Sequence, residues 1–330
     1  MTNDFSRAGL LRAIPAALAG AALMLATLAV HAQAWPTKPV KLVVTYPPGG
    51  TVDAVARILA PRLSARLGQP VVIDNRAGAG GAIGGDLVAK SAPDGYTVML
   101  DASNHAQNPA LRKMPFDTLR DLAPVSLLVK VPNVLVVNPA TSIHSVKDLI
   151  AQAKAKPGSI NFASSGNGSA QHLAGELFAS MAGVEMTHVP YKGGGPALTD
   201  VMAGQVPVFF ASIASSLSFI QSGKLRAVAV TGKAASPALP RLPTVAQSGL
   251  PGYEVYEWNA VFVPAQTPAA IVERLSKEIA ATLQEAEVRA RLEALGAEVV
   301  GSSPAELDSF RRAEIAKWTR LAKDNKIQLD

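Results

Sequence analysis

Apolar runs alternate with helical patterns along most of the chain. The run VKLVVTY (40–46) is followed by a helical pattern over 53–67, whose apolar residues recur on one face. Two further apolar runs, PVVIDN (70–75) and YTVMLDAS (96–103), flank a glycine-rich turn and a helix around 87–90. This βαβαβ order predicts a parallel sheet with helices on both faces.

A second series of the same kind begins with VPNVLVVNP (131–139), which is typical of a strand that crosses from one unit to another. The strands expected next are 160–165, 186–191, 206–212 and 225–232, and the helices are 146–154, 170–181 and one from Pro196. A proline-rich loop (237–252) then precedes a second crossing strand, YEVYEWNAVFVP (253–264). The last expected helices are 269–284, 286–295 and 304–323.

Two crossings between two α/β units predict two lobes, the second inserted into the first. We place lobe one at 35–135 plus 255–330, and lobe two at 136–254. A protein of this architecture binds its ligand between the lobes, at the carboxyl ends of the strands.

The first 34 residues have the features of a secretory signal peptide. Arg7 and Arg12 precede an apolar run over 13–30, and Ala32 and Ala34 are the small residues that a signal peptidase requires. We expect cleavage after Ala34.

The alternative to a cleaved signal is a retained membrane anchor. The apolar run is barely long enough to span a bilayer, it contains Pro15, and no basic cluster follows it. The chain has no cysteine, hence no disulfide and no acceptor for a lipid at the cleavage site. These features favour a mature protein that diffuses in the periplasm.

The charge pattern argues against a nucleic-acid partner. The formal net charge is +6, but Lys and Arg do not cluster with aromatic residues as they do in nucleic-acid-binding proteins. The pair Arg311 and Arg312 lies in a helical pattern with acidic neighbours, which indicates a solvated helix face.

Five predicted strand ends carry glycine, a small polar residue (Ser, Thr or Asn) or both just before a helix: 47–53, 75–85, 101–108, 164–171 and 192–197. The start of a helix exposes unpaired N–H groups and about half a positive charge, a favourable environment for a carboxylate or phosphate. The structural alternative is an ordinary turn in which Asp53 or Ser169 caps its helix. Five such loops opening on one site favour anion binding.

Known catalytic and metal-binding motifs do not match. PPGGTVDAVA lacks the Lys-Ser/Thr of a phosphate-binding loop, and the chain has no Gly-x-Ser-x-Gly elbow. His172 falls inside a predicted helix after Ser165, where we expect it to pack or to orient the helix. The histidines have no metal-ligand spacing, and His105 alone lies on a loop near the expected site. We therefore expect no catalytic residue, metal or cofactor.

Several motifs together resemble one family. PPGGTVDAVAR, IDNRAGAGGAIGG, FASSGNGSAQHLAGELF, HVPYKGGGPALTDVMAGQV and LPTVAQSGLPGYEVYEWNAVFVPAQTP occur in the order seen in the Bug family, the periplasmic receptors of tripartite tricarboxylate transporters. The resemblance covers residues 35–330. It implies a type II periplasmic-binding-protein fold that closes on a small carboxylated solute. An exported hydrolase or a sensory module on the same fold is the alternative.

The resemblance also implies the ligand-binding residues. They are Tyr46, Gly49, Gly50, Thr51, Asp53, Ser103, Asn104, Ser164, Ser165, Gly166, Asn167, Gly168 and Ser169. Asp101 departs from the small or hydroxyl residues common in the family, and it either pairs with a ligand ammonium or points away from the ligand. We expect a monomer that hands its solute to the membrane subunits of such a transporter, or to a sensor.

Overall fold

The computed structural model describes residues 35–327. From Lys38 onward, the described residues form one compact unit that contains every element described below. Its strands are β1 (Val40–Val44), β2 (Val71–Asn75), β3 (Thr97–Ala102), β4 (Leu122–Val137), β5 (Asn161–Ser164), β6 (Thr187–Pro190), β7 (Val208–Ser212), β8 (Arg226–Val230), β9 (Tyr256–Pro264) and β10 (Glu298–Val299). Its helices are α2 (Thr51–Leu67), η1 (Ala79–Gly81), α3 (Ala82–Ala89), α4 (Asn104–Leu111), α5 (Val146–Ala155), α6 (Ala170–Ala182), α7 (Gly194–Met202), α8 (Ile213–Gln221), α9 (Ala269–Leu283), α10 (Ala286–Ala294) and α11 (Pro304–Asp324).

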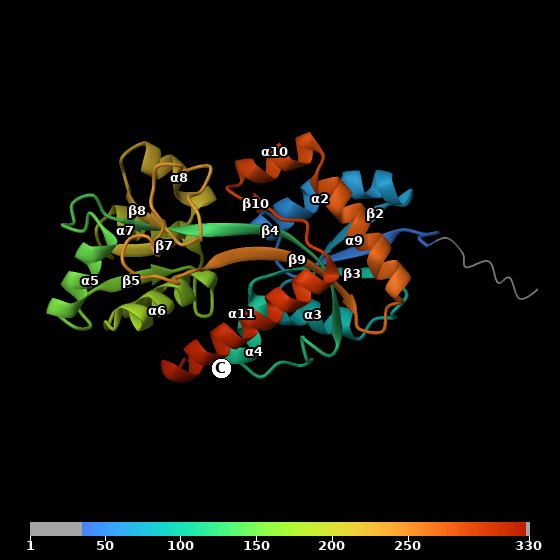
Figure 1. The fold of residues 1–330 in the computed structure, drawn as a ribbon, viewed down its shortest axis with the longest axis horizontal. Helices are drawn as coiled ribbons and strands as arrows, with labels where there is room; N and C mark the ends of the chain where they lie inside the picture. Colours follow the sequence, from blue (N-terminus) through green and yellow to red (C-terminus); the bar gives the residue numbers. More distant parts are fainter. Residues whose placement is uncertain (1–34, 328–330) are drawn as a thin grey trace, which may run out of the picture. The chain divides into compact units, whose positions relative to one another are not determined.

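The strands form a mixed sheet in the order β2-β1-β3-β9-β4-β7-β5-β6, with β8 and β10 also paired to β4. β1 is parallel to β2 and β3, as the βαβαβ pattern predicted. β5 is likewise parallel to β6 and β7. The long strands β4 and β9 are antiparallel to each other and lie between these two parallel groups (Figure 1).

Strand β4 changes its pairing partner along its length. Its residues Leu122–Pro132 pair with β9, and its residues Asn133–Val137 pair with β7. The strand begins at Leu122, nine residues before the predicted crossing strand that starts at Val131. Pro124 obscures the strand pattern; the pairing with β9 is irregular between Pro124 and Ser126, and such an irregularity accommodates proline.

Four of the described elements were not predicted: η1, α4, α8 and the short strand β10. Helix α4 illustrates the reason. Its buried residues include His105, Gln107 and Asn108, and Pro109 lies within it, so it has no apolar stripe against a polar face. Helix α3 also starts earlier than the predicted helix around 87–90, because Gly84 and Gly85 hide its pattern.

The hydrophobic core lies on both faces of β4. Leu135 and Val137 belong to a cluster that also contains Phe162 and Trp258, whereas Val134 and Val136 belong to another cluster on the opposite face. Burial of both faces explains why β4 is a nearly continuous apolar run. Among residues 35–327, no helix combines the length and the apolar character needed to cross a bilayer.

The expectation that Arg311 lies on a solvated helix face is wrong. Its side chain is 3% exposed and pairs with Asp308 at 2.6 Å. Its Nη1 donates hydrogen bonds of 2.9 Å to the carbonyls of Thr118 and Leu122. Arg311 therefore fixes α11 to the start of β4, and only Arg312 is solvated, with 57% of its side chain exposed.

Candidate functional site

The buried carboxylate of Asp53 fixes the turn after β1. Oδ2 of Asp53 accepts hydrogen bonds from the backbone N–H of Gly49 at 2.9 Å and from Arg57 Nε at 2.8 Å. Oδ1 accepts from Asn75 Nδ2 at 3.0 Å. These donors, the Arg57 hydrogen bond above all, lower the pKa of Asp53 to about 2. Asp53 is therefore charged at neutral pH, and both of its oxygens are engaged within the loop.

Above this carboxylate, helix α2 begins without a side-chain cap. Its N-cap residue is Gly50, which offers no side chain to accept from the first turn. The first N–H groups of such a helix have no partner within it. Gly49 and Gly50 are exposed and Thr51 is half-buried, so the start of the helix is open to a ligand. The φ of +88° at Gly49 is a conformation that favours glycine.

Asn104 connects the end of β3 to the loop after β5. Its Nδ2 donates a hydrogen bond of 3.0 Å to the carbonyl of Gly168, and its Oδ1 accepts from the Tyr46 hydroxyl at 2.8 Å. Three of the predicted positions, which lie on loops after β1, β3 and β5, are thus in one hydrogen-bonded chain. Ser103 lies beside Asn104, and its buried hydroxyl has no partner among the described residues.

Asp101 lies beneath these loops in a buried network. Its Oδ1 accepts from the Thr45 hydroxyl at 2.6 Å and from the N–H of Ala102 at 2.9 Å. Its Oδ2 lies 3.3 Å from Nδ1 of His105, whose ring stacks on Phe262 with a centroid distance of 3.9 Å. Burial lowers the pKa of His105. Of the two alternatives for Asp101, this geometry fits a carboxylate that points away from the ligand.

Two stacked histidines support the loop after β5. The rings of His172 and His188 are parallel with centroids 3.8 Å apart. The N–H of Gly168 donates to Nδ1 of His172 at 3.1 Å, and a 2.6 Å hydrogen bond joins Ser164 Oγ to Nε2 of His188. His172 thus packs, as predicted, and its ring also holds the loop at Gly168. Ser164 Oγ also accepts from the N–H of Gly166 at 3.0 Å, and this hydrogen bond stabilises the turn.

The remaining predicted residues of this loop lie at its surface. Ser165, Gly166 and Ser169 are half-buried and Asn167 is exposed. Ser169 caps α6, because its hydroxyl accepts from the N–H of His172 at 3.2 Å. The neighbouring helix α7 starts after Gly193 and has no side-chain cap. The N–H groups of Gly166, Gly168 and Ser169 are already paired within the protein. The backbone donors that this side offers a ligand are therefore those of Ser165 and Asn167 and of the start of α7.

Sequence reasoning missed polar residues on the crossing strands. Glu257 on β9 is half-buried, and no described residue lies within hydrogen-bond or ion-pair distance of its carboxylate. The amide of Asn133 on β4 is fully buried, and neither its nitrogen nor its oxygen has a partner in the part of the chain that the structure describes. The run YEVYEWNAVFVP contains two acids, and Glu257, the one followed directly by the apolar part of the run, was the signal that could have drawn attention to this position.

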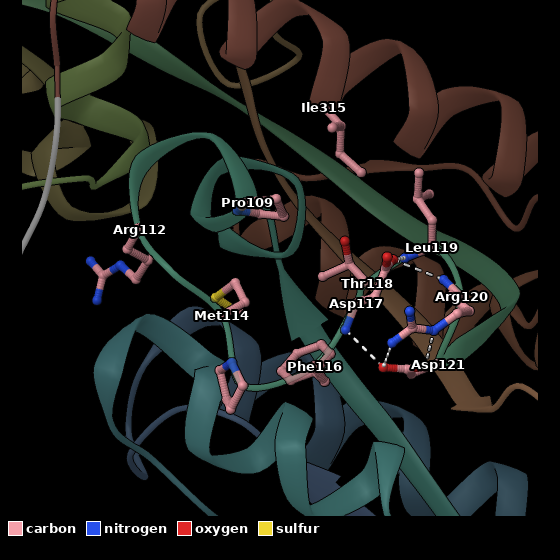
Figure 2. Close-up of a pocket in the computed structure, with 11 residues that line it drawn as sticks. Pro109, Arg112, Met114, Phe116, Asp117, Thr118, Leu119, Arg120, Asp121 and Ile315 are labelled. Atoms are coloured by element: carbon pink, nitrogen blue, oxygen red, sulfur yellow. Dashed lines mark hydrogen bonds and ion pairs between the residues drawn. The ribbon is translucent and has the colours of Figure 1, made fainter.

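A cavity of about 510 Å³ lies elsewhere, between α4, the start of β4 and α11, and contains none of the predicted residues (Figure 2). Among its charged groups, Arg120 Nε donates to Asp121 at 2.8 Å and Asp117 accepts from the backbone N–H of Leu119 at 2.9 Å. Arg112, also in the lining, forms no ion pair among the described residues. Over residues 35–327, no group of three or more His, Asp or Glu side chains is arranged to hold a metal ion.

Comparison with known proteins gives a consistent result. A family model described as tripartite tricarboxylate transporter family receptor matches residues 55–327. Protein BugT of Bordetella pertussis is 40% identical over 303 residues, which cover 91% of this chain and 93% of BugT.

Solved structures of similar proteins share the fold. Rpa4515 of R. palustris, solved with adipate, is 40% identical with a TM-score of 0.78 and covers 89% of this chain and 99% of its own. The periplasmic binding protein BugD is 34% identical with a TM-score of 0.75, at 89% and 99% coverage. MatC from Rhodopseudomonas palustris, with bound malate, is 31% identical with a TM-score of 0.74, at 87% and 99% coverage. The predicted two-lobe periplasmic-binding-protein fold is confirmed. By sequence and by fold, the chain belongs to the Bug family of tripartite tricarboxylate transporter receptors.

Proposed function

We propose that this protein captures a small carboxylate in the periplasm and delivers it to a tripartite tricarboxylate transporter. The observation that carries the proposal is the hydrogen bond of 3.0 Å from Asn104 to Gly168, because it joins loops of the two strand groups at the predicted ligand residues. Adipate in Rpa4515 and malate in MatC, two small dicarboxylates, support the ligand class.

The two loops supply donors for the two ends of such a ligand. We assign one carboxylate to the start of α2, where Gly50 and Thr51 present N–H groups and a hydroxyl beside Gly49, whose own N–H is held by Asp53. We assign the other to the loop over 165–169, together with the uncapped start of α7. Hydrogen bonds to charged groups contribute about 1.5–3 kcal/mol each, so four to six of them suffice for the roughly −8 kcal/mol of micromolar binding after the cost of ordering.

Other predicted residues act through these loops. Asp53 holds the turn of Gly49, and Ser164 holds the turn of Gly166, with their acceptor atoms directed at backbone N–H groups. We propose that both position the donors and that neither touches the ligand. Tyr46 has a similar positioning role, because its hydroxyl donates a hydrogen bond to the side chain of Asn104.

We propose the lobe boundaries 35–135 plus 255–330 and 136–254. The change of partner along β4, from β9 up to Pro132 to β7 from Asn133, supports a boundary close to residue 135. On the return path, the N–H of Val255 donates to Thr231 at 2.9 Å before β9 begins. Two strands that cross at one place allow a hinge motion, so ligand binding is expected to reduce the radius of gyration in solution scattering.

One observation could favour the alternative of a hydrolase: a 2.6 Å hydrogen bond joins Ser164 and His188, a pairing that a nucleophile and a base would also form. Ser164 is fully buried, and no carboxylate among the described residues orients His188. Burial, and then the charge of His172, lowers the pKa of His188 to about 3. A base of that pKa is poorly matched to catalysis near neutral pH. We therefore favour a binding protein without catalytic residues.

The proposed location and partners have separate tests. The predicted cleavage site after Ala34 lies outside the described residues; N-terminal sequencing of the periplasmic fraction should find Trp35 first. An intact chain in the membrane fraction would support an anchor instead. We expect a monomer in light scattering, and loss of carboxylate uptake when the chromosomal copy is deleted in a strain that has the transporter. Uptake that is unchanged would favour a sensor as partner.

Titration calorimetry tests the function directly. We expect the purified protein beginning at Trp35 to bind at least one acid of a panel that contains adipate, malate and succinate, with micromolar affinity. Thr51→Val removes a hydroxyl at nearly constant volume and should weaken that binding, whereas Thr199→Val, at an exposed site on α7, should not. No binding to any carboxylate, or turnover of ester substrates, would overturn the proposal.

A further inference from the structure

The crossing strands present a polar face beside the predicted ligand loops. Successive residues of a strand point to opposite faces, so Glu257 and Asn259 share one face of β9. Glu257 pairs in register with Val131, and Asn133 is two residues further along the same face of β4. The acid Glu257 and the amides of Asn259 and Asn133 therefore lie on one face of the paired strands β4 and β9.

The other face of β9 is apolar and packed. Trp258 lies edge-on to His105 with ring centroids 6.3 Å apart, and Phe262 stacks on the same imidazole at 3.9 Å. Trp258 also packs against Phe310 of α11 at 5.5 Å. Since these contacts occupy the side of α4 and α11, Glu257 lies on the opposite face of the sheet.

The register places Glu257 next to the candidate site. Asn259 pairs with Ala102, the last residue of β3, so Glu257 lies two positions beyond that pair, on the side where Ser103 and Asn104 begin the next loop. The charge of Glu257 is also close enough to Tyr46 to help raise the pKa of that phenol, after burial and Asp101. Glu257 and the Tyr46–Asn104 pair thus share one region.

The polar groups of this face lack protein partners. Glu257 forms no ion pair within residues 35–327, although the positive charge of Arg112 is also felt at Tyr46. Both side-chain atoms of Asn133 and Oδ1 of Asn259 are buried without a hydrogen bond from the described residues. Burying amide groups unpaired is costly, and native proteins retain such groups mainly where something else pairs with them. The half-buried carboxylate of Glu257 lies on the same face as these amides.

We propose that Glu257 is the counter-ion of a cationic nitrogen on the ligand, with Asn133 and Asn259 lining the same subsite. The ligand is then a carboxylate that also carries an ammonium group, as an amino acid does. This inference rests on the proposed function, because the loops after β1 and β5 must hold the carboxylate ends. Removing water from the site strengthens the attraction between the carboxylate and the ammonium.

Matched ligand pairs separate this inference from the general function. The probes are succinate and aspartate, glutarate and glutamate, and adipate and 2-aminoadipate, which differ within each pair only by the ammonium group. The wild-type protein should prefer the amino member of at least one pair by about tenfold or more, the size expected for a desolvated charge pair. Glu257→Gln should abolish that preference and leave, or improve, binding of the acid without nitrogen.

Glu254→Gln is the control, because it removes the same charge three residues earlier on the chain and should keep the preference. Dicarboxylate binding without any preference for the amino member, or an equal loss of both members in Glu257→Gln, would overturn the role of Glu257 while the proposed function stands. Failure of all six acids to bind would contradict both. Melting curves of each variant establish that it is folded.

Discussion

The side-chain amide of Asn104 donates a hydrogen bond of 3.0 Å to the backbone carbonyl of Gly168, 64 residues away in the sequence. One residue follows β3 and the other follows β5, so the contact joins the two groups of strands on either side of β4 and β9. The same amide accepts from Tyr46, and a single side chain therefore sets the spacing of three loops.

Asn104→Asp should weaken carboxylate binding by about tenfold or more. The aspartate still accepts from Tyr46, but it loses the donor to Gly168 and adds a negative charge beside an anion. Titration calorimetry measures the effect, and Tyr46→Phe is the control, since it removes one hydrogen bond and should cost about 1 kcal/mol. Unchanged affinity in Asn104→Asp would show that Asn104 does not line the site.

Gly168→Asp should abolish detectable carboxylate binding in a folded protein. Gly168 has a φ of +72°, a conformation that Asn tolerates better than most residues, so Gly168→Asn is the matched variant without the charge. We expect the aspartate variant to bind more than about 30-fold more weakly than the asparagine variant, with similar melting temperatures, since like charges repel strongly in a desolvated site. Equal affinities would mean that no anion lies at this loop.

Asp53→Asn should lower both stability and affinity, because it weakens the support of the turn at Gly49. The lowered pKa of Asp53, about 2 against 3.8, means that its contribution is present above pH 4 and is lost as the pH falls toward 2. We expect a loss of about 1–2 kcal/mol in urea unfolding at pH 7. Arg57→Gln keeps the hydrogen bond to Gly49 and should cost less. A larger effect of Arg57→Gln would contradict this account.

His188 should make the protein less stable in mild acid. Its pKa is about 3 in the folded state against 6.5 normally, so the unfolded chain binds more protons between these values and stability falls as the pH drops below about 6.5. Because His188 is half-buried, we expect a discounted loss of about 1–2 kcal/mol between pH 7 and pH 4. His188→Gln should flatten this dependence in urea titrations, whereas His144→Gln, at an exposed site, should not. Parallel curves for wild type and His188→Gln would contradict the assignment.

The order of strands and the loops at their ends could be predicted from the sequence. Apolar runs such as 40–46 and 206–212 have the length and composition of strands, and glycine with Ser or Asn marks the turns that follow. The resemblance to the Bug family placed Tyr46, Asn104 and Gly168 in one site at these strand ends, and the structure brings them together.

What the sequence could not show is the direction of each side chain within a loop. Asp53 and Ser164 were expected beside the ligand, whereas the structure directs them at backbone N–H groups of their own turns. The stacking of His172 on His188 depends on how α6 packs over β6, which no local pattern contains. Glu257 was missed because its unpaired state is visible only when every neighbour is known.

The position of Trp258 gives the protein a built-in optical reporter. The indole follows Glu257 on β9, is fully buried, and touches His105, which is linked to Asp101 beneath the ligand loops. The chain has three tryptophans, and Trp318 is held by its own hydrogen bond of 3.1 Å to Glu314. A change in emission that persists in Trp318→Phe and disappears in Trp258→Phe reports on the hinge, so ligand capture can be timed by stopped-flow fluorescence in the unlabelled protein.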